Sequence, residues 1–255
     1  MSNQRITMRY ELEGEGPDVV LIHGLGQRLE EWKWQKEDLI KNGYRVLTYD
    51  MRGHGESGWS EEEVTIATYA DDLNHLLELL SIEKAHLVGL SMGGAVAQAF
   101  YRAYPGKVLS LVLAATFSYF AEDIKRVSIE SRLAYIDQGK MVELAELIAK
   151  RSFTENAPAE LIENAKQIIA ANDLKAYHAS MIASVNADSR DVLAAINVPV
   201  LIVVGEGDLT TPLACSEYLH QEIKGSQLVV IPEARHIVTQ ERAEEFNQAL
   251  LAFLC

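Results

Sequence analysis

Short apolar runs alternate with longer amphipathic runs along most of the chain. Helical patterns, for example at 66–81 and 240–254, separate the apolar runs. Six runs carry Val, Ile and Leu at consecutive positions, as strands do when both faces of a parallel sheet are buried; they are 18–24, 44–50, 85–91, 108–115, 198–205 and 227–232. This alternation predicts an α/β fold with a mostly parallel sheet and helices on both faces.

Two regions depart from this rhythm. Segment 4–13 alternates apolar and polar residues, which predicts antiparallel strands at the edge of the sheet. Residues 116–188 show only helical patterns, interrupted at Gly139 and Pro158. We expect residues 116–188, called the cap below, to lie over the ends of the strands within a single domain spanning 1–255.

The stretch "AHLVGLSMGGAVAQAF" at 85–100 places a serine where a predicted strand meets a predicted helix. Gly89, Ser91 and Gly93 form a G-x-S-x-G motif there. In a strand-to-helix setting this motif makes a sharp turn that presents the serine oxygen above the sheet. Glycines permit the crowded backbone of such a turn. Ser91 is therefore the predicted nucleophile.

A serine of ordinary pKa is a weak nucleophile and needs a base and an orienting acid. Asp208 follows the strand at 198–205, and His236 follows the strand at 227–232, giving the chain order Ser, Asp, His. Because the carboxyl ends of parallel strands meet at one edge of a sheet, the three side chains can converge. Glu206 is the competing acid; Asp208 is favoured because Glu206 is longer and lies nearer the strand end.

Acyl transfer also needs hydrogen-bond donors for the oxyanion, and backbone N–H groups serve because they are fixed before the reaction. Met92 follows the nucleophile and begins a helix, whose N-terminal dipole favours negative charge. Leu25 lies in "HGLG" at 23–26, directly after an apolar strand. We expect the N–H groups of Leu25 and Met92 to form the oxyanion hole.

Five motifs occur in order: "HGLG", "DMRGHGESG", "GLSMGG", "GEGD" and "RH". With them the chain resembles the α/β-hydrolase fold family over essentially its full length, and small esterases, haloperoxidase-like hydrolases and 3-oxoadipate enol-lactonases in particular. The resemblance implies a mostly parallel eight-stranded sheet, with the cap at 116–188 between the sixth and seventh strands. It also implies that the protein needs no metal ion and no organic cofactor.

The motifs together predict a serine hydrolase that cleaves a small carboxylic ester or lactone through an acyl-enzyme. Three alternatives share the fold and the serine: a C–C bond hydrolase, a thioesterase or acyltransferase, and a slow-turnover ligand-sensing protein. Within the cap, His178 and Arg132 are candidates for lining the substrate pocket.

Charge and composition restrict the partners. The formal net charge of −14 over 255 residues disfavours nucleic acids and anionic membranes, which leaves a small-molecule substrate. No apolar run is long enough for a membrane span or a signal peptide, so we expect a cytoplasmic protein. Cys215 and Cys255 form no disulfide or metal-binding pattern. The sequence leaves the oligomeric state open.

Overall fold

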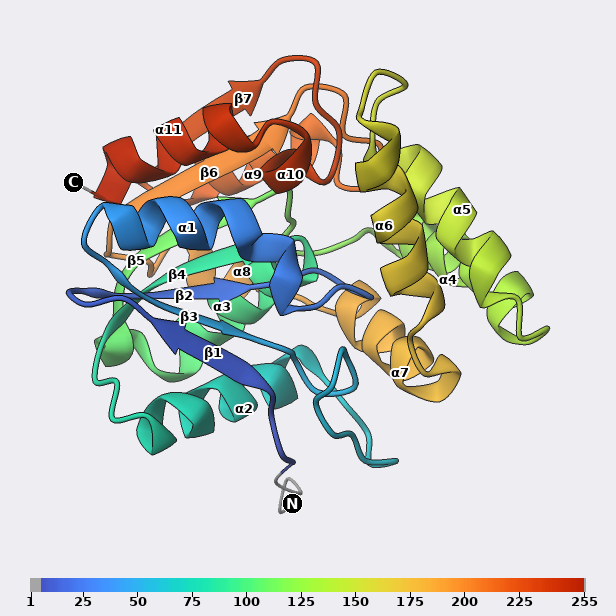
Figure 1. Cartoon of the computed structure of the whole chain (residues 1–255), viewed down its shortest axis with the longest axis horizontal. Coiled ribbons are helices and arrows are strands. Elements are labelled where there is room, and N and C mark those ends of the chain that lie inside the picture. The colour runs from blue at the N-terminus through green and yellow to red at the C-terminus, as the bar shows by residue number, and fades with distance from the viewer. Residues whose placement is uncertain (1–5, 255) are drawn as a thin grey trace.

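The computed structural model describes residues 6–254, and seven strands form the sheet at its centre (Figure 1). Their order across the sheet is β1-β3-β2-β4-β5-β6-β7. Pairing is parallel except between β1 and β3. The strands are β1 Tyr10–Glu13, β2 Asp18–Ile22, β3 Arg45–Tyr49, β4 Ala85–Leu90, β5 Val108–Ala114, β6 Val200–Gly205 and β7 Gln227–Ile231.

The expected eight strands are therefore a miscount for the residues that the structure describes. Segment 4–13 supplies only β1; residues 4 and 5 of that expectation lie outside the described residues. Thr7 and Arg9 bond to the loop after β3 instead of to another strand: the N–H groups of Gly58 and Asp50 donate to their carbonyls, both at 2.9 Å. The cap consequently follows the fifth strand, β5, and precedes β6, whereas the sequence predicted the sixth and seventh.

Helices cover both faces of the sheet, as the sequence pattern predicts. On β2, Val20 and Ile22 face one apolar core while Val19 and Leu21 face the other. The first core is closed by α2 Ile66–Leu79, α3 Met92–Ala103, α8 Arg190–Leu193 and α9 Leu213–Glu222, and the second by the 3-10 turn η1 Leu29–Trp32, α1 Lys33–Lys41, α10 Val238–Glu241 and α11 Ala243–Leu254.

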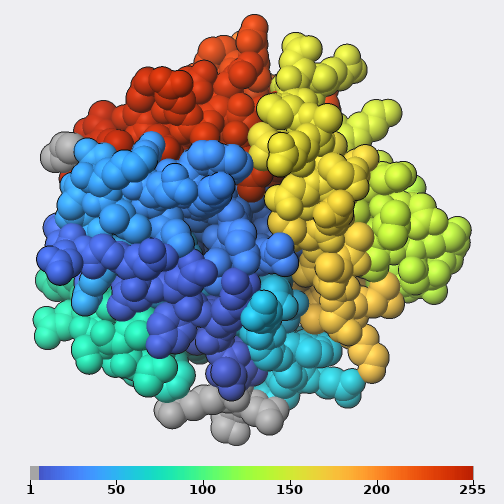
Figure 2. Space-filling model, in the orientation of Figure 1, coloured from blue at the N-terminus to red at the C-terminus, as the bar shows by residue number. Residues whose placement is uncertain are grey.

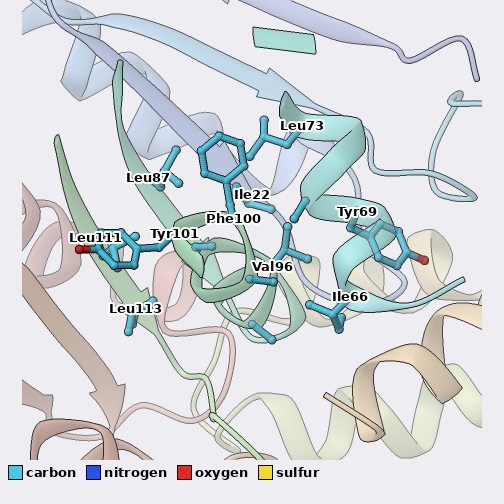
Figure 3. Packing of buried hydrophobic residues seen from close by; sticks show 14 of the residues in the cluster. Ile22, Ile66, Tyr69, Leu73, Leu87, Val96, Phe100, Tyr101, Leu111 and Leu113 are labelled. Atoms are coloured by element: carbon cyan, nitrogen blue, oxygen red, sulfur yellow. The ribbon is translucent and has the colours of Figure 1, made fainter. Parts of the chain in front are cut away.

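The larger core fixes the helix that carries the candidate nucleophile. Figure 3 shows Phe100 and Val96 of α3 between β-strand residues such as Leu87 and α2 residues such as Leu73. All four side chains are almost fully removed from water. Burial of this kind stabilises the fold by about 1.5 to 3 kcal/mol per large apolar side chain. Helix α3 therefore has a firmly set position relative to β4.

The cap forms a layer of helices beyond the carboxyl ends of the strands (Figure 1). Figure 2 shows α6 and α7, in yellow and gold, closing against the loops of the N-terminal half. Asn172 donates to the carbonyl of Gly26 (2.8 Å) and Tyr69 donates to Ser180 (2.7 Å), which holds the cap to those loops and to α2. The cap helices are α4 Glu122–Ile136, α5 Met141–Ser152, α6 Ala159–Ala170 and α7 Leu174–Val185.

The chain returns from the cap to the sheet through residues 186–199, which include α8. Val192, Leu193 and Ile196 pack into the larger core. This stretch is thus the crossover that two neighbouring parallel strands require. Within residues 6–254, no helix combines the length and the apolar character needed to cross a membrane.

Candidate active site

Ser91 lies at the turn between β4 and α3 in a strained backbone conformation, with φ of 55° and ψ of −118°. A positive φ is rare for a residue with a side chain and marks a conformation that the surroundings enforce. A Cβ at Gly93 would lie 2.1 Å from the carbonyl oxygen of Ile22, and one at Gly89 would lie 2.3 Å from that of Gly93. The two glycines of the motif are therefore required by close backbone contact.

His236 stands beside Ser91 and Asp208 at the carboxyl end of the sheet. Its Nε2 lies 2.9 Å from Ser91 Oγ, and its Nδ1 lies 2.8 Å from Asp208 Oδ2. The three residues come from the loops after β4, β6 and β7. Their convergence follows from the parallel pairing of those strands, because parallel strands end at a common edge.

The loop after β6 holds the carboxylate of Asp208 in place. The N–H groups of Thr210 and Thr211 donate to Oδ1 (2.7 and 3.0 Å), and the Thr211 hydroxyl donates to Oδ2 (2.9 Å). Burial acts to raise the pKa of Asp208, but the charge and hydrogen bond of His236 and these backbone donors outweigh it and lower the pKa. Asp208 is therefore an anion facing His236, while the competing Glu206 is exposed.

The loop after β2 passes next to Ser91 and is closed by two hydrogen bonds. Gln27 N–H donates to the Gly24 carbonyl, and Gly24 N–H donates to Gln27 Oε1, both at 3.2 Å. A Cβ at Gly24 would lie 3.4 Å from Ser91 Cβ. Leu25 follows Gly24 and lines the cavity above Ser91, while Met92 is the first residue of α3. Of the two expected oxyanion donors, Met92 thus follows the serine directly in the chain, and Leu25 belongs to a loop that lies beside it.

A cavity of about 600 Å³ opens between this edge of the sheet and the cap. Ser91 and His236 contribute to its floor, and α4, α5 and α7 contribute to its walls. Its apolar lining includes Leu25, Phe117, Phe120, Leu147, Ile148, Phe153, Ile169, Val185 and Ile237. One acidic residue, Asp123, and three arginines, Arg126, Arg132 and Arg151, complete the charged part of that lining.

The two candidates from the cap differ in position. Arg132 lines the cavity and donates to Ser128 Oγ (2.8 Å), and it forms no ion pair with any carboxylate of residues 6–254. Burial raises the pKa of Tyr177, another residue of the cavity lining, and the positive charge of Arg132 opposes that rise. His178 is half-buried on α7 and is not among the cavity-lining residues; its neighbour Tyr177 occupies the face of α7 that turns to the cavity.

A comparison with a family model shows to which protein family the chain belongs. A model of the alpha/beta hydrolase fold matches residues 17–243. The chain belongs to the alpha/beta hydrolase fold family.

Relatives of this alpha/beta hydrolase carry several activities in their names. The 3-oxoadipate enol-lactonase 1 of Acinetobacter baylyi is 29% identical, over 99% of this chain and 95% of its own. A thermophilic esterase from Thermogutta terrifontis is 33% identical with a TM-score of 0.90, and the match covers 98% and 93% of the two chains. A bromoperoxidase from Bacillus anthracis is 30% identical with a TM-score of 0.92, over 98% and 95%.

Two residues near His236 and Asp208 were not predicted from the sequence as part of the site. Thr211 supports Asp208 with both its N–H and its hydroxyl; its signal was a hydroxyl residue three positions after a loop aspartate, where such turns bond locally. Glu241 bonds to the loop before His236, and nothing in its sequence surroundings indicates this. Among residues 6–254, no group of three His, Cys, Asp or Glu side chains gathers as metal ligands would.

Proposed function

We propose that this protein is a serine hydrolase that cleaves a small carboxylic ester or lactone. The observation that carries the proposal is the chain of contacts from Ser91 Oγ to His236 Nε2 and from His236 Nδ1 to Asp208, at 2.9 and 2.8 Å, on the floor of a closed-over cavity. An ionised carboxylate, an imidazole and a serine in this order perform acyl transfer on several unrelated folds.

In the proposed reaction His236 Nε2 accepts the proton of Ser91 while Oγ attacks the carbonyl carbon. The carbonyl oxygen gains the negative charge and accepts hydrogen bonds from the N–H groups of Leu25 and Met92. Asp208 holds the imidazole and stabilises its charged form. His236 then protonates the leaving alkoxide, and a water molecule, deprotonated by His236, attacks the acyl-enzyme and releases the acid and Ser91.

The cavity supports a substrate with an apolar body and one anionic group. Its walls are mostly aliphatic and aromatic, and Arg132 provides a half-buried cation with no carboxylate partner among the described residues. A guanidinium of this kind binds carboxylates well because its N–H groups match their geometry. The enol-lactonase and esterase relatives support ester or lactone chemistry for the same pocket.

The test is a series of p-nitrophenyl esters from acetate to octanoate, measured with the wild type and with Ser91→Ala. We expect rapid hydrolysis that falls by on the order of 10⁴ or more in the variant, because the serine acts as one unit with its base. A fluorophosphonate should label Ser91, as located by mass spectrometry. Labelling elsewhere would contradict the assignment, and ester rates independent of Ser91 would favour a C–C hydrolase, a thioesterase or a ligand sensor.

A further inference from the structure

The last turn of α5 is bonded to the loop that carries His236. The N–H of Ile237 donates to the Ser152 carbonyl (3.1 Å). Arg235 Nη1 donates to the carbonyls of Lys150 and Phe153, both at 2.8 Å. These carbonyls lie at the C-terminal end of a helix and have no hydrogen-bond partner within it, so the guanidinium of Arg235 supplies their missing donor. The residues on either side of His236 are thus both attached to the cap helix.

Glu241 makes a second connection between the same two segments. Its Oε1 accepts hydrogen bonds from the N–H and the hydroxyl of Thr154, at 2.7 and 2.5 Å. Its Oε2 accepts the N–H of Arg235 at 2.8 Å. The residue is only 8% exposed, so water competes little for this carboxylate. One buried side chain of α10 therefore joins the segment directly after α5 to the loop before His236.

The same turn of α5 also reaches the loop of the acid. Arg151 Nη2 donates to the carbonyl of Leu209, the residue after Asp208, at 2.5 Å. Segment 150–154 consequently bonds to both loops that provide partners of Ser91. By contrast, the neighbouring Arg242 is paired with the exposed Glu233 at 2.9 Å.

We propose that Arg235 and Glu241 are positioning residues that fix the imidazole of His236 through the docked end of α5. The inference rests on the proposed function, because it assigns their effect to the base of that reaction. With either contact removed, the loop at 234–237 loses an anchor next to His236, and Nε2 spends less time within reach of Ser91 Oγ. Displacements of about 1 Å lower catalytic rates by up to about a hundredfold.

The experiment compares Arg235→Met with the matched control Arg242→Met, which removes the same charge at the far end of α10. Active-site titration with a fluorophosphonate counts folded enzyme, and kcat is expressed per titrated site. We expect Arg235→Met to lower kcat about tenfold, with a small change in KM and an equal fall in the rate of Ser91 phosphonylation. Arg235→Lys should recover part of the rate, and Arg242→Met should stay within twofold.

Hydrogen exchange separates this inference from the proposed function. In Thr154→Val and Glu241→Gln, the N–H groups of Arg235 and Ile237 should exchange at least tenfold faster than in the wild type, while Thr154→Ser should keep them protected. Exchange unchanged from the wild type, or a kcat of Arg235→Met equal to that of Arg242→Met, would overturn the positioning role. A wild type without Ser91-dependent turnover would instead contradict the hydrolase assignment.

Discussion

The loops at the carboxyl ends of the strands and helix α4 face the same cavity but are packed differently. Ser91, Asp208 and His236 lie on loops whose backbones are fixed by close contacts and by several hydrogen bonds. On α4, only Ile136 is buried, while Ile124 and Val127 line the cavity and yet are 52% and 59% exposed. The difference supports the proposal that the reacting groups lie on the tightly packed side and that the loosely packed side selects the substrate.

The largest effect should come from adding one methyl group on the packed side. Gly93→Ala places a Cβ 2.1 Å from the carbonyl oxygen of Ile22 and 2.7 Å from that of His23, and neither backbone can easily move away. We expect a loss of about 3 kcal/mol or more in the free energy of unfolding. Urea denaturation of the purified variant measures this directly.

Gly106→Ala is the matched control for that substitution. A Cβ there meets nothing within 4 Å, so stability should change by less than about 1 kcal/mol. Equal stability of the Gly93 and Gly106 variants would show that the turn at Ser91 is not as constrained as its geometry indicates, and the contrast with α4 would fail.

A smaller effect on the packed side should depend on pH. Glu31 is buried and accepts hydrogen bonds from Thr239 and Gln240 of α10, both at 2.6 Å. Burial raises the pKa of Glu31 to about 8 in the folded protein, although these hydrogen bonds act to lower it. The folded state therefore holds a proton that the unfolded state releases near its ordinary pKa, and wild-type stability falls as pH rises from that value toward 8.

Glu31→Gln removes this linkage because the amide has no proton to lose. Between about pH 5.5 and 7.5, the stability of the variant relative to the wild type should rise by about 2 kcal/mol. Glu30→Gln, which removes an exposed partner of Arg9, is the control and should show no such trend. Thermal or urea unfolding across the pH range gives the answer, and parallel curves for Glu31→Gln and the wild type would place an ordinary carboxylate at this position.

The smallest effect should come from the cap. Arg132→Gln should raise KM about tenfold for an ester with a free carboxylate on its acyl chain, since a charge-assisted hydrogen bond is lost, and leave the neutral ester unchanged. Arg126→Gln, a mostly exposed lining residue, is the control and should stay within twofold. A fall in kcat on both esters would mean that α4 takes part in the chemistry and would remove the contrast between the two sides.

Local patterns in the sequence predicted most of the sheet. The six apolar runs became strands within two residues of the expected ends, because buried parallel strands need apolar residues on both faces. The convergence of the loops after β4, β6 and β7 could also be predicted, because parallel strands end on the same side of the sheet. Over residues 6–254 the sheet has one strand fewer than expected, because residues 6–9 bond to the loop at 50–58, a contact that no local pattern shows.

Contacts between segments that are distant in the chain could not be predicted from the sequence. Glu241 looks like one more acid on a C-terminal helix, and only the fold brings it to Thr154 of the cap. Arg235 likewise finds its carbonyl partners on α5. On α7, the sequence could not show whether Tyr177 or His178 faces the cavity, because the rotation of a cap helix is set by packing against its neighbours.

The crossover through residues 186–199 also bears on how such proteins diversify. Residues 186–199 carry the chain back across the sheet to the start of β6, so the four helices before them take no part in the pairing of β5 with β6. Recombination or insertion can therefore exchange most of those helices without disturbing the register of the strands or the turn at Ser91, as long as the contacts of segment 150–154 are kept. Under the proposed function, the fold thus separates the strands that carry the reaction from the part of the cap that can vary with the substrate.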